Sequence, residues 1–182
     1  MKKQILLAVA ALALSSVAAA QSYGVISAGK SKHDLDCDGA ATCDDSGTAF
    51  KLLGGYKFMP NFAVEGGYMS YGKTKAADPG ISLNLEVDGF GIGGAFHQDF
   101  ATNWNFVARL GVAQMKAKAR ATAGGISASD SDSSTQLYGG LGLGYRLTKQ
   151  MSLDAAWDFS RAKIAGEKAD VSALSLGLTF DF

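Results

Sequence analysis

Four aspartates in one short segment of the sequence are spaced like the oxygen ligands of a calcium ion. Asp34, Asp36 and Asp38 alternate, Gly39 follows them, and Asp45 stands at the twelfth position counted from Asp34. Loops of this spacing bind calcium through carboxylates at the first, third and fifth positions, and the glycine permits a sharp turn. The last position holds Asp where such loops carry a bidentate Glu, and no flanking helices are expected. A calcium site and an acidic, solvated loop are therefore both open for this segment.

The two cysteines of the chain lie in the same segment. Cys37 and Cys43 have five residues between them. In an oxidising compartment such a pair is expected to form a disulfide, which would close a short loop and contribute about 2 kcal/mol. A free thiol pair and a metal site are the alternatives. The choice depends on whether the chain is exported.

The first twenty residues have the layout of a secretory signal peptide. Lys2 and Lys3 precede an apolar run over residues 5–14, and Ala18 and Ala20 form an A-x-A-like cleavage site. A membrane anchor is the alternative, but this run is too short to cross about 30 Å of hydrocarbon as a helix. We therefore predict that residues 1–20 are a signal peptide, cleaved after Ala20.

The remaining chain, residues 21–182, is predicted to form one domain. Removal of the leader takes Lys and Arg from 17 to 15 against 17 acidic residues, so the net charge becomes about −2. A nucleic-acid-binding protein would need a basic patch, which this balance does not favour. No later stretch is apolar over eighteen residues, so no transmembrane helix is predicted.

Apolar and polar or small residues alternate through most of this domain. Successive side chains of a strand point to opposite faces, so the alternation predicts two-faced β-strands. One segment changes parity between Val87 and Phe90, and a bulge near Gly89 would reconcile its two halves. The eight predicted strands cover residues 22–30, 50–58, 62–69, 83–97, 104–113, 136–147, 152–160 and 174–182.

The connections between these strands alternate in length. Long polar connections and short turns in alternation are typical of an outer-membrane barrel, which has long external loops and short periplasmic turns. With eight strands and a long first connection, both termini are expected in the periplasm. The long connections are predicted at residues 31–47, 73–82, 117–134 and 163–169, and the short ones at 59–61, 99–103 and 148–150.

The composition of the two strand faces distinguishes a membrane barrel from a soluble, lipocalin-like one. One face carries large apolar side chains with almost no charge, and the other is mostly Gly, Ala and Ser with a few charges of both signs. A soluble barrel would need a hydrated outer face rich in Lys, Glu and Thr. A narrow interior accepts small residues and sparse charges. The sequence therefore predicts an all-β fold, an eight-stranded antiparallel up-and-down transmembrane β-barrel with its apolar face in lipid.

Five charged residues on the small-residue face are expected inside the barrel. Glu65, Arg109, Arg146, Asp154 and Asp158 share the inward parity. Buried charges must be paired because an unpaired one costs several kcal/mol. We predict a charge network that plugs the interior; an ion path through the barrel is the alternative.

Two segments of the chain resemble the OmpA/OmpX-like family of small outer-membrane barrels. Residues 51–58 and 61–68, Lys-Leu-Leu-Gly-Gly-Tyr-Lys-Phe and Asn-Phe-Ala-Val-Glu-Gly-Gly-Tyr, resemble its second and third strands. The ending Leu-Gly-Leu-Thr-Phe-Asp-Phe, with Phe180 and Phe182, resembles the assembly signal that such barrels present to the barrel-insertion machinery. The resemblance implies a Gram-negative outer membrane, with its lipids and lipopolysaccharide as partners.

These features favour a structural or surface-interaction role: membrane integrity, adhesion, or ligand contact through the external loops. An OmpW-like channel for small molecules is the alternative. An enzyme is not predicted, because His33 and His97, the two histidines of the chain, are expected at opposite sides of the membrane, although Ser31 stands near His33. No cofactor is expected beyond the calcium ion considered above.

Overall fold

The computed structural model describes residues 21–33, 42–44, 46–78, 81–123, 126–164 and 167–182. Apart from short turns, the described residues form strands. Among the residues described, no helix is long and apolar enough to cross a membrane. The signal peptide predicted over residues 1–20 lies outside the described part of the chain. The strands are β1 (Ser22–His33), β2 (Thr42–Asp44), β3 (Ser46–Met59), β4 (Phe62–Asp78), β5 (Ile81–Asp99), β6 (Trp104–Ala123), β7 (Ile126–Arg146), β8 (Met151–Ile164) and β9 (Glu167–Asp181).

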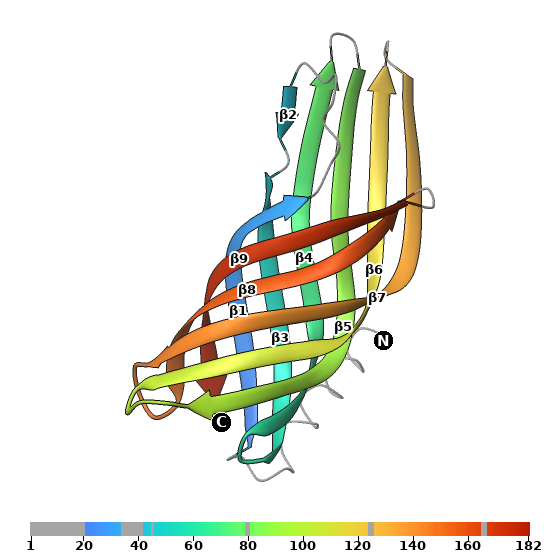
Figure 1. Cartoon of the computed structure of the whole chain (residues 1–182). Helices are drawn as coiled ribbons and strands as arrows, with labels where there is room; N and C mark the ends of the chain where they lie inside the picture. The colour runs from blue at the N-terminus through green and yellow to red at the C-terminus, as the bar shows by residue number, and fades with distance from the viewer. Residues whose placement is uncertain (1–20, 34–41, 45, 79–80, 124–125, 165–166) are drawn as a thin grey trace, which may run out of the picture.

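Eight of these strands close into an antiparallel up-and-down barrel, as predicted (Figure 1). Each strand pairs with its neighbours in the order β1, β3, β4, β5, β6, β7, β8, β9. The ring is closed by β1 and β9, which run together from Tyr23↔Asp181 to His33↔Val171. Closure leaves no free sheet edge around the ring, which a sheet in lipid requires because hydrocarbon cannot hydrogen-bond a free edge.

The short strand β2 stands outside the ring. It pairs with the far end of β4, from Thr42↔Ala77 to Asp44↔Lys75. The long polar connection predicted over residues 31–47 is wrong in part, because residues 31–33, 42–44 and 46–47 are in strands. Polar residues form strands where water surrounds them, and polarity alone was mistaken for a loop.

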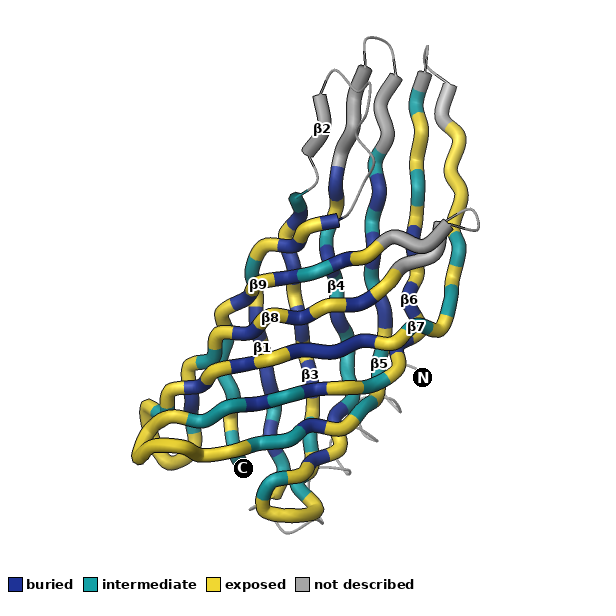
Figure 2. Tube along the Cα trace, viewed as in Figure 1, coloured by how far each residue is buried: buried dark blue, intermediate teal, exposed yellow. Residues whose placement is uncertain are grey.

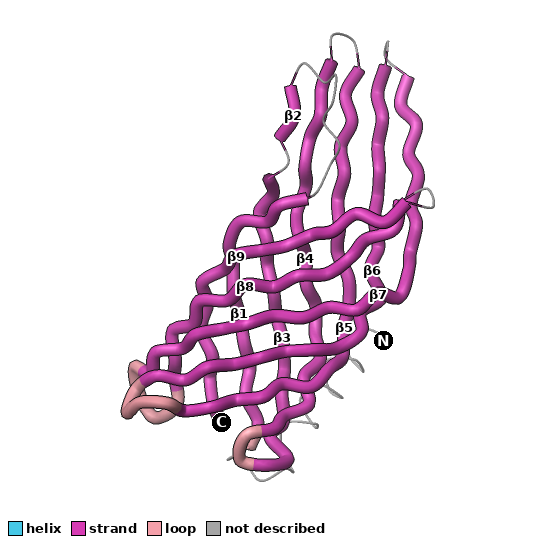
Figure 3. The backbone as a smooth tube through the Cα atoms, viewed as in Figure 1, coloured by secondary structure: helices cyan, strands magenta, loops and turns pink. Residues whose placement is uncertain are grey.

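The same error shortened the four central strands. The predicted loops 73–82 and 117–134 are almost entirely β-structure, and β6 pairs with β7 as far as Ala123↔Ile126. Here the hairpins extend far beyond the rest of the barrel (Figure 1). We call this part the extension; it comprises residues 73–78 of β4, 81–88 of β5, 114–123 of β6 and 126–135 of β7. The opposite end, the turn end, holds the three short turns that connect β3 to β4, β5 to β6 and β7 to β8 (Figure 3).

Buried and exposed residues alternate along the strands of the ring (Figure 2), and the exposed set is largely apolar. On β7, Leu137, Leu141 and Leu143 point outwards and are 69%, 45% and 43% exposed. A continuous exposed apolar surface of this kind is unstable in water and fits a lipid environment. Aromatic side chains are exposed near the turn end, as a membrane interface favours: Tyr56, Phe58, Phe62, Trp104, Tyr145, Phe180 and Phe182.

The apolar face changes sides at the base of the extension. On β5, Phe90 and Ile92 point outwards and are exposed, whereas Leu85 and Val87 point inwards and are buried. The bulge predicted on this strand near Gly89 is therefore wrong: β5 pairs with β6 without a register shift, and the extra residue in its ladder with β4 lies on β4, opposite Val87 and Asp88. The parity changes because the surroundings change: the outside is apolar around the ring and polar around the extension.

The register shift between β4 and β5 lies on β4, between Ser70 and Gly72. Gly72 has a φ of +74°, a left-handed conformation that glycine adopts without steric cost. A Cβ atom there would lie within 3 Å of the backbone of Thr48 on β3. The shift separates β4 from β3, because β4 pairs with β3 only as far as Phe50↔Ser70, and it directs β4 into the extension.

Candidate functional site

A buried ion pair crosses the interior near the middle of the barrel. Arg109 on β6 donates from Nε to Oε2 of Glu65 on β4 at 2.8 Å, and the two side chains are 6% and 1% exposed. Tyr23 on β1 donates from its hydroxyl to the other carboxylate oxygen at 2.6 Å. Both oxygens of the carboxylate are therefore hydrogen-bonded, which is what a buried charge requires.

His97 on β5 extends this network towards the turn end, where it also lines the pocket that includes Pro60 and Asn61. Its Nε2 lies 3.0 Å from the hydroxyl oxygen of Tyr23. Since the single hydroxyl proton of Tyr23 is given to Glu65, the histidine must be the donor in this contact. The ring also packs edge-on against Tyr23, with centroids 5.2 Å apart. Four strands are thus tied together by Tyr23, Glu65, His97 and Arg109.

A second ion pair lies closer to the extension. Lys51 on β3 contacts Oδ2 of Asp158 on β8 at 2.5 Å, and the side chains are 9% and 12% exposed. The anion of the first pair is on β4 and the anion of the second pair is on β8, the strand on the opposite side of the ring. Each charge inside this part of the barrel therefore has a counterion from another strand.

The five residues predicted as one interior network separate into several contacts. Glu65 and Arg109 are brought together, and Asp158 is paired with Lys51. Asp154 accepts a hydrogen bond from the hydroxyl of Thr179 at 2.6 Å. Arg146 lies apart from these groups at the turn end. There it pairs with Asp99 at 3.1 Å, with both side chains more than a third exposed.

Three further members of the interior network, Lys51, Tyr23 and His97, were not predicted from the sequence. Lys51 had the inward parity, and this parity was a sufficient signal to include it. Tyr23 lies on the strand with the weakest alternation, where glycine and small residues obscured the face of each side chain. The sequence argument on His97 concerned enzyme chemistry alone, and its hydrogen bond to a buried tyrosine was not predicted.

A polar vestibule opens at the turn end, below the central ion pair. Its volume is about 260 Å³, and its lining includes Lys57, His97, Asp154 and Asp181, with Arg109 at its inner limit. Lys57 and Asp181 form an ion pair at 2.8 Å across it, with side chains about a third exposed. The vestibule is a hydrated entrance that ends at the network of Glu65 and Arg109.

Apolar side chains fill the interior on the other side of the ion pairs. Met69, Tyr71, Val87, Met115 and Tyr138 are all at most 4% exposed and pack together as one cluster. A cavity beside this cluster has a volume of about 20 Å³, which is room for about one water molecule. The cluster therefore supplies the base of the extension with a hydrophobic core.

Ser31 and His33, the candidate Ser-His pair, lie next to this core at the end of β1. Both side chains are nearly inaccessible, at 0% and 2% exposed. Each donates a hydrogen bond to the carbonyl oxygen of Tyr71, the histidine at 2.9 Å. Tyr71 stands at the register shift of β4, so these two residues satisfy a carbonyl that the shifted sheet leaves inside the protein.

The outward face of the extension carries a group of cations. Lys73 on β4 lies 3.5 Å from Glu86, and Lys118 on β6 lies 3.9 Å from Asp88. Lys116 and Arg120, on the same face of β6, have no counterion among the described residues. A groove of about 540 Å³ crosses this face; its lining includes the cations Lys73, Lys118 and Arg120, the acids Glu86 and Asp130, and Ser129 and Ser131 of β7.

The predicted calcium and disulfide sites cannot be placed in this geometry. Asp34, Asp36, Asp38, Asp45 and Cys37 lie outside the described residues, and so does the side chain of Cys43. Within the described part of the chain, no group of three or more His, Cys, Asp or Glu side chains could hold a metal ion. Both sites stay predictions.

The sequence and the fold of this chain are similar to those of known barrel proteins. The sequence profile of the outer membrane protein beta-barrel domain family matches residues 5–182. Among solved structures, Ail, the attachment invasion locus protein of Yersinia pestis, is similar with 22% identity and a TM-score of 0.57, over 88% of this chain and 99% of that chain. Neisserial surface protein A has 17% identity and a TM-score of 0.61, over 88% of this chain and 97% of that chain.

A second structure of Ail contains the heparin analogue sucrose octasulfate, and it matches with 22% identity and a TM-score of 0.56, over 88% of this chain and 99% of that chain. At these identities the likeness is one of fold. A comparison with curated proteins finds no match.

Proposed function

The chain belongs to the family of outer membrane protein beta-barrel domains, and on this premise we propose that it is a filled barrel whose extension contacts anionic ligands outside the cell. The single observation that carries the proposal is the extension itself. Four strands continue far beyond the apolar belt as a hydrogen-bonded sheet, up to Ala123↔Ile126 in β6 and β7. A sheet that is ordered outside the lipid presents a fixed surface to a ligand.

The proposed orientation places the extension outside the cell and the turn end in the periplasm. The asymmetry of the two ends supports it, since outer-membrane barrels have short periplasmic turns and long external connections. Both ends of the described chain, near Gln21 and Phe182, then lie in the periplasm. Phe182 and Phe180 are exposed there, as we propose for residues that the barrel-assembly machinery contacts during insertion.

The interior supports a structural role better than the alternative, an OmpW-like channel for small molecules. A channel needs a continuous path, and the two ion pairs and the apolar cluster occupy successive levels of the described interior. The cavity of about 20 Å³ beside them does not connect the vestibule to the extension as a pore would. We therefore infer a barrel that is closed to ions and small solutes.

The charge of the extension supports an anionic ligand. The four described cations on the outward face, Lys73, Lys116, Lys118 and Arg120, outnumber the three acidic residues beside them, Glu86, Asp88 and Asp130. Side chains of Lys and Arg at this position can reach sulfate or phosphate groups of a ligand in water. Lipopolysaccharide of the surrounding membrane and polyanions of another cell surface both carry such groups.

Two measurements on refolded protein in detergent test the proposal. In a planar bilayer we expect no steady single-channel conductance, and a steady conductance would overturn the filled interior. With fluorescent heparin, a soluble sulfated polyanion, we expect binding that weakens as salt rises. A variant with Lys73→Gln, Lys118→Gln and Arg120→Gln should bind at least about tenfold more weakly.

Lys149→Gln is the matched control, because this exposed lysine lies in a short turn at the opposite end of the barrel. It should leave heparin binding unchanged. Absence of heparin binding by the unmodified protein, or equal loss in the control variant, would contradict the role of the extension.

A further inference from the structure

Strands β7 and β8 separate part of the way along the barrel wall. They pair from Arg146↔Ser152 to Tyr138↔Ser160 and no further. Beyond this point β7 continues with β6 into the extension, and β8 continues with β9 to Ile164↔Glu167. The two hairpins diverge here, β6–β7 rising and β8–β9 turning aside (Figure 1). The hydroxyl of Ser160 donates to the carbonyl oxygen of Leu137 at 3.1 Å and so ends the ladder between them.

A groove of about 750 Å³ lies at this divergence, a size in the range of small-molecule binding sites. Its outer floor is apolar and belongs to the belt: Leu110, Leu137, Trp157 and Phe159 are between 43% and 69% exposed. Phe159 lies over Gly139, where a Cβ atom would lie 2.6 Å from Cζ of the ring. The absence of a side chain at Gly139 therefore leaves room for the Phe159 ring on the floor of the groove.

The groove is blind on its inner side. It ends at Tyr138 and Val171, which are 4% and 2% exposed and belong to the apolar cluster of the interior. The cavity beyond Tyr138 has a volume of only about 20 Å³. An occupant would therefore be held in the groove and would not pass through the wall.

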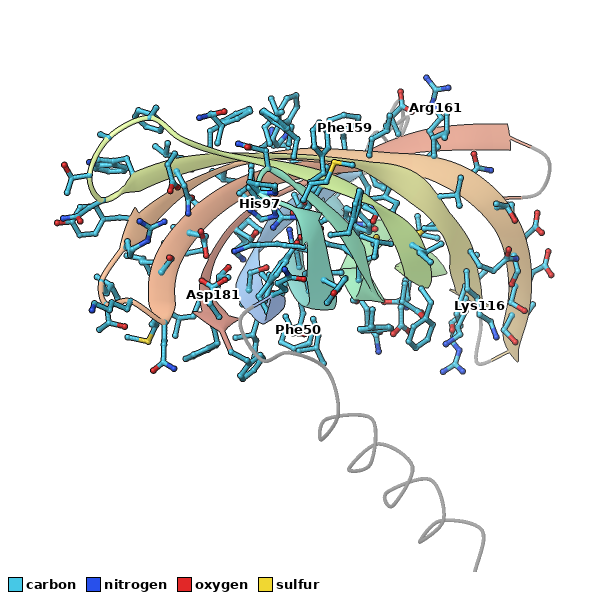
Figure 4. All side chains as sticks on the ribbon, turned by 90° about the horizontal axis from the view of Figure 1, so that it is seen from below. Phe50, His97, Lys116, Phe159, Arg161 and Asp181 are labelled. Carbon is cyan, nitrogen blue, oxygen red and sulfur yellow. The ribbon has the colours of Figure 1, made fainter. Side chains whose placement is uncertain are left out.

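The rim of the groove towards the extension carries two cations and one anion. Arg161 on β8 donates to Asp170 on β9 at 2.8 Å, and the side chains are 61% and 66% exposed. Arg161 and Phe159 point away from the barrel on the same side (Figure 4). An exposed pair of this kind is weak, and a guanidinium has five N–H donors, so Arg161 can bind a further anion. Lys32 on β1, also exposed, lines the same groove.

We propose that this groove binds one lipid of the surrounding membrane that carries a phosphate group in a net anionic head group. An acyl chain would lie on Leu137, Trp157 and Phe159, and the phosphate would lie between Lys32 and Arg161. The groove opens from the apolar belt, so its occupant comes from the lipid phase and not from solution. A net positive rim at the edge of an apolar floor matches a head group with net negative charge above a hydrocarbon chain.

The two tryptophans of the chain allow a direct test. In a Trp104→Phe variant the remaining Trp157 reports on the groove, and in a Trp157→Phe variant Trp104 reports on the turn end. Each variant is reconstituted in bilayers of phosphatidylcholine with rising fractions of dibrominated phosphatidylglycerol or dibrominated phosphatidylcholine, and bromine quenching of fluorescence is measured.

We expect phosphatidylglycerol to quench Trp157 at a mole fraction at least about threefold lower than phosphatidylcholine does, and Trp104 to respond equally to both. Lys32→Gln with Arg161→Gln should remove the preference at Trp157, while Lys149→Gln should keep it. Both substituted residues are exposed, so the variants should fold, which the shift between boiled and unboiled samples on an SDS gel verifies. Equal quenching of Trp157 by the two lipids, or a preference that survives the double substitution, would overturn the proposal.

These results are independent of the proposed function. The heparin measurement uses cations of β4 and β6, and the lipid measurement uses cations of β1 and β8. Loss of heparin binding with an intact lipid preference would remove the extension proposal alone, and the reverse result would remove the groove proposal alone.

Discussion

Arg109 on β6 and Glu65 on β4 face each other across the barrel interior, with Nε 2.8 Å from Oε2. The second carboxylate oxygen accepts a hydrogen bond from Tyr23 on β1. The pair is almost completely removed from solvent, so its two charges depend on each other. Removal of either one would leave the other buried without a counterion.

We predict that Arg109→Met strongly destabilises the barrel. Removing one member of a buried ion pair costs about 3–5 kcal/mol, because the remaining charge has lost its partner. The double variant Glu65→Gln/Arg109→Met should recover part of this loss. Urea unfolding of the refolded protein in lipid vesicles, followed by tryptophan fluorescence, gives the free energies. A single variant as stable as the exposed control Lys149→Met would argue against burial of this pair.

Gly72 and Gly54 form a matched pair for the register shift. Gly72→Ala should lower the free energy of unfolding by about 1–3 kcal/mol, because a left-handed residue with a side chain is strained and the Cβ atom would meet the backbone of Thr48. Gly54→Ala should be tolerated, since nothing lies within 4 Å of a Cβ atom there. The same unfolding assay compares them, and equal losses would mean that the shift on β4 needs no glycine.

The boundary of the apolar belt can be located on a single strand. Leu141 and Thr135 both point outwards on β7, but Leu141 lies within the belt and Thr135 lies beyond it. Leu141→Arg should cost about 2–4 kcal/mol, the cost of a basic side chain near the bilayer midplane, and Thr135→Arg should cost close to nothing. Unfolding in vesicles measures both. If the two substitutions were equally tolerated, the belt would not be the lipid-facing surface.

The disulfide between Cys37 and Cys43 is expected because an exported chain folds under oxidising conditions. Intact protein treated with iodoacetamide should gain no adduct before reduction and two adducts after it, as measured by mass spectrometry. The Cys37→Ser/Cys43→Ser variant should lose at most about 2 kcal/mol of unfolding free energy, because the disulfide closes only a short loop in the connection between β1 and β3. Alkylation before reduction would show that the thiols are free.

The alternation of side chains predicts the ring of this barrel well and its extension poorly. On β7, the leucines from Leu137 to Leu143 identify a strand in lipid because the outside is uniformly apolar. On β6, Lys116, Lys118 and Arg120 alternate with Ala117, which is buried, and Ala119, which is partly buried, but a small residue beside a charged one is also the pattern of a loop. The strand in the belt and the strand in the extension differ only in what surrounds them, lipid or water. A short segment of sequence does not show which of the two surrounds it.

The interior site was partly predictable for the same reason. Parity places Glu65, Arg109 and Asp158 inside the barrel, and the structure does the same. Parity does not show which strands face one another across the interior. The pairing of Asp158 with Lys51 on β3 could therefore not be derived from the sequence. Arg146 has the inward parity as well, but it stands at the turn end, where the inside is open to water and Asp99 is the nearest acid.

The contact between β1 and β9 differs from every other contact in the ring, because it joins residues as far apart as Tyr23 and Asp181. All other pairs of barrel strands are consecutive along the chain and can form as local hairpins. The last hydrogen bonds to form are therefore those between the two ends of the domain, and until they form both edges are open. Synthesis of β9 is thus a precondition for ring closure, because a chain without β9 keeps two open strand edges that lipid cannot hydrogen-bond.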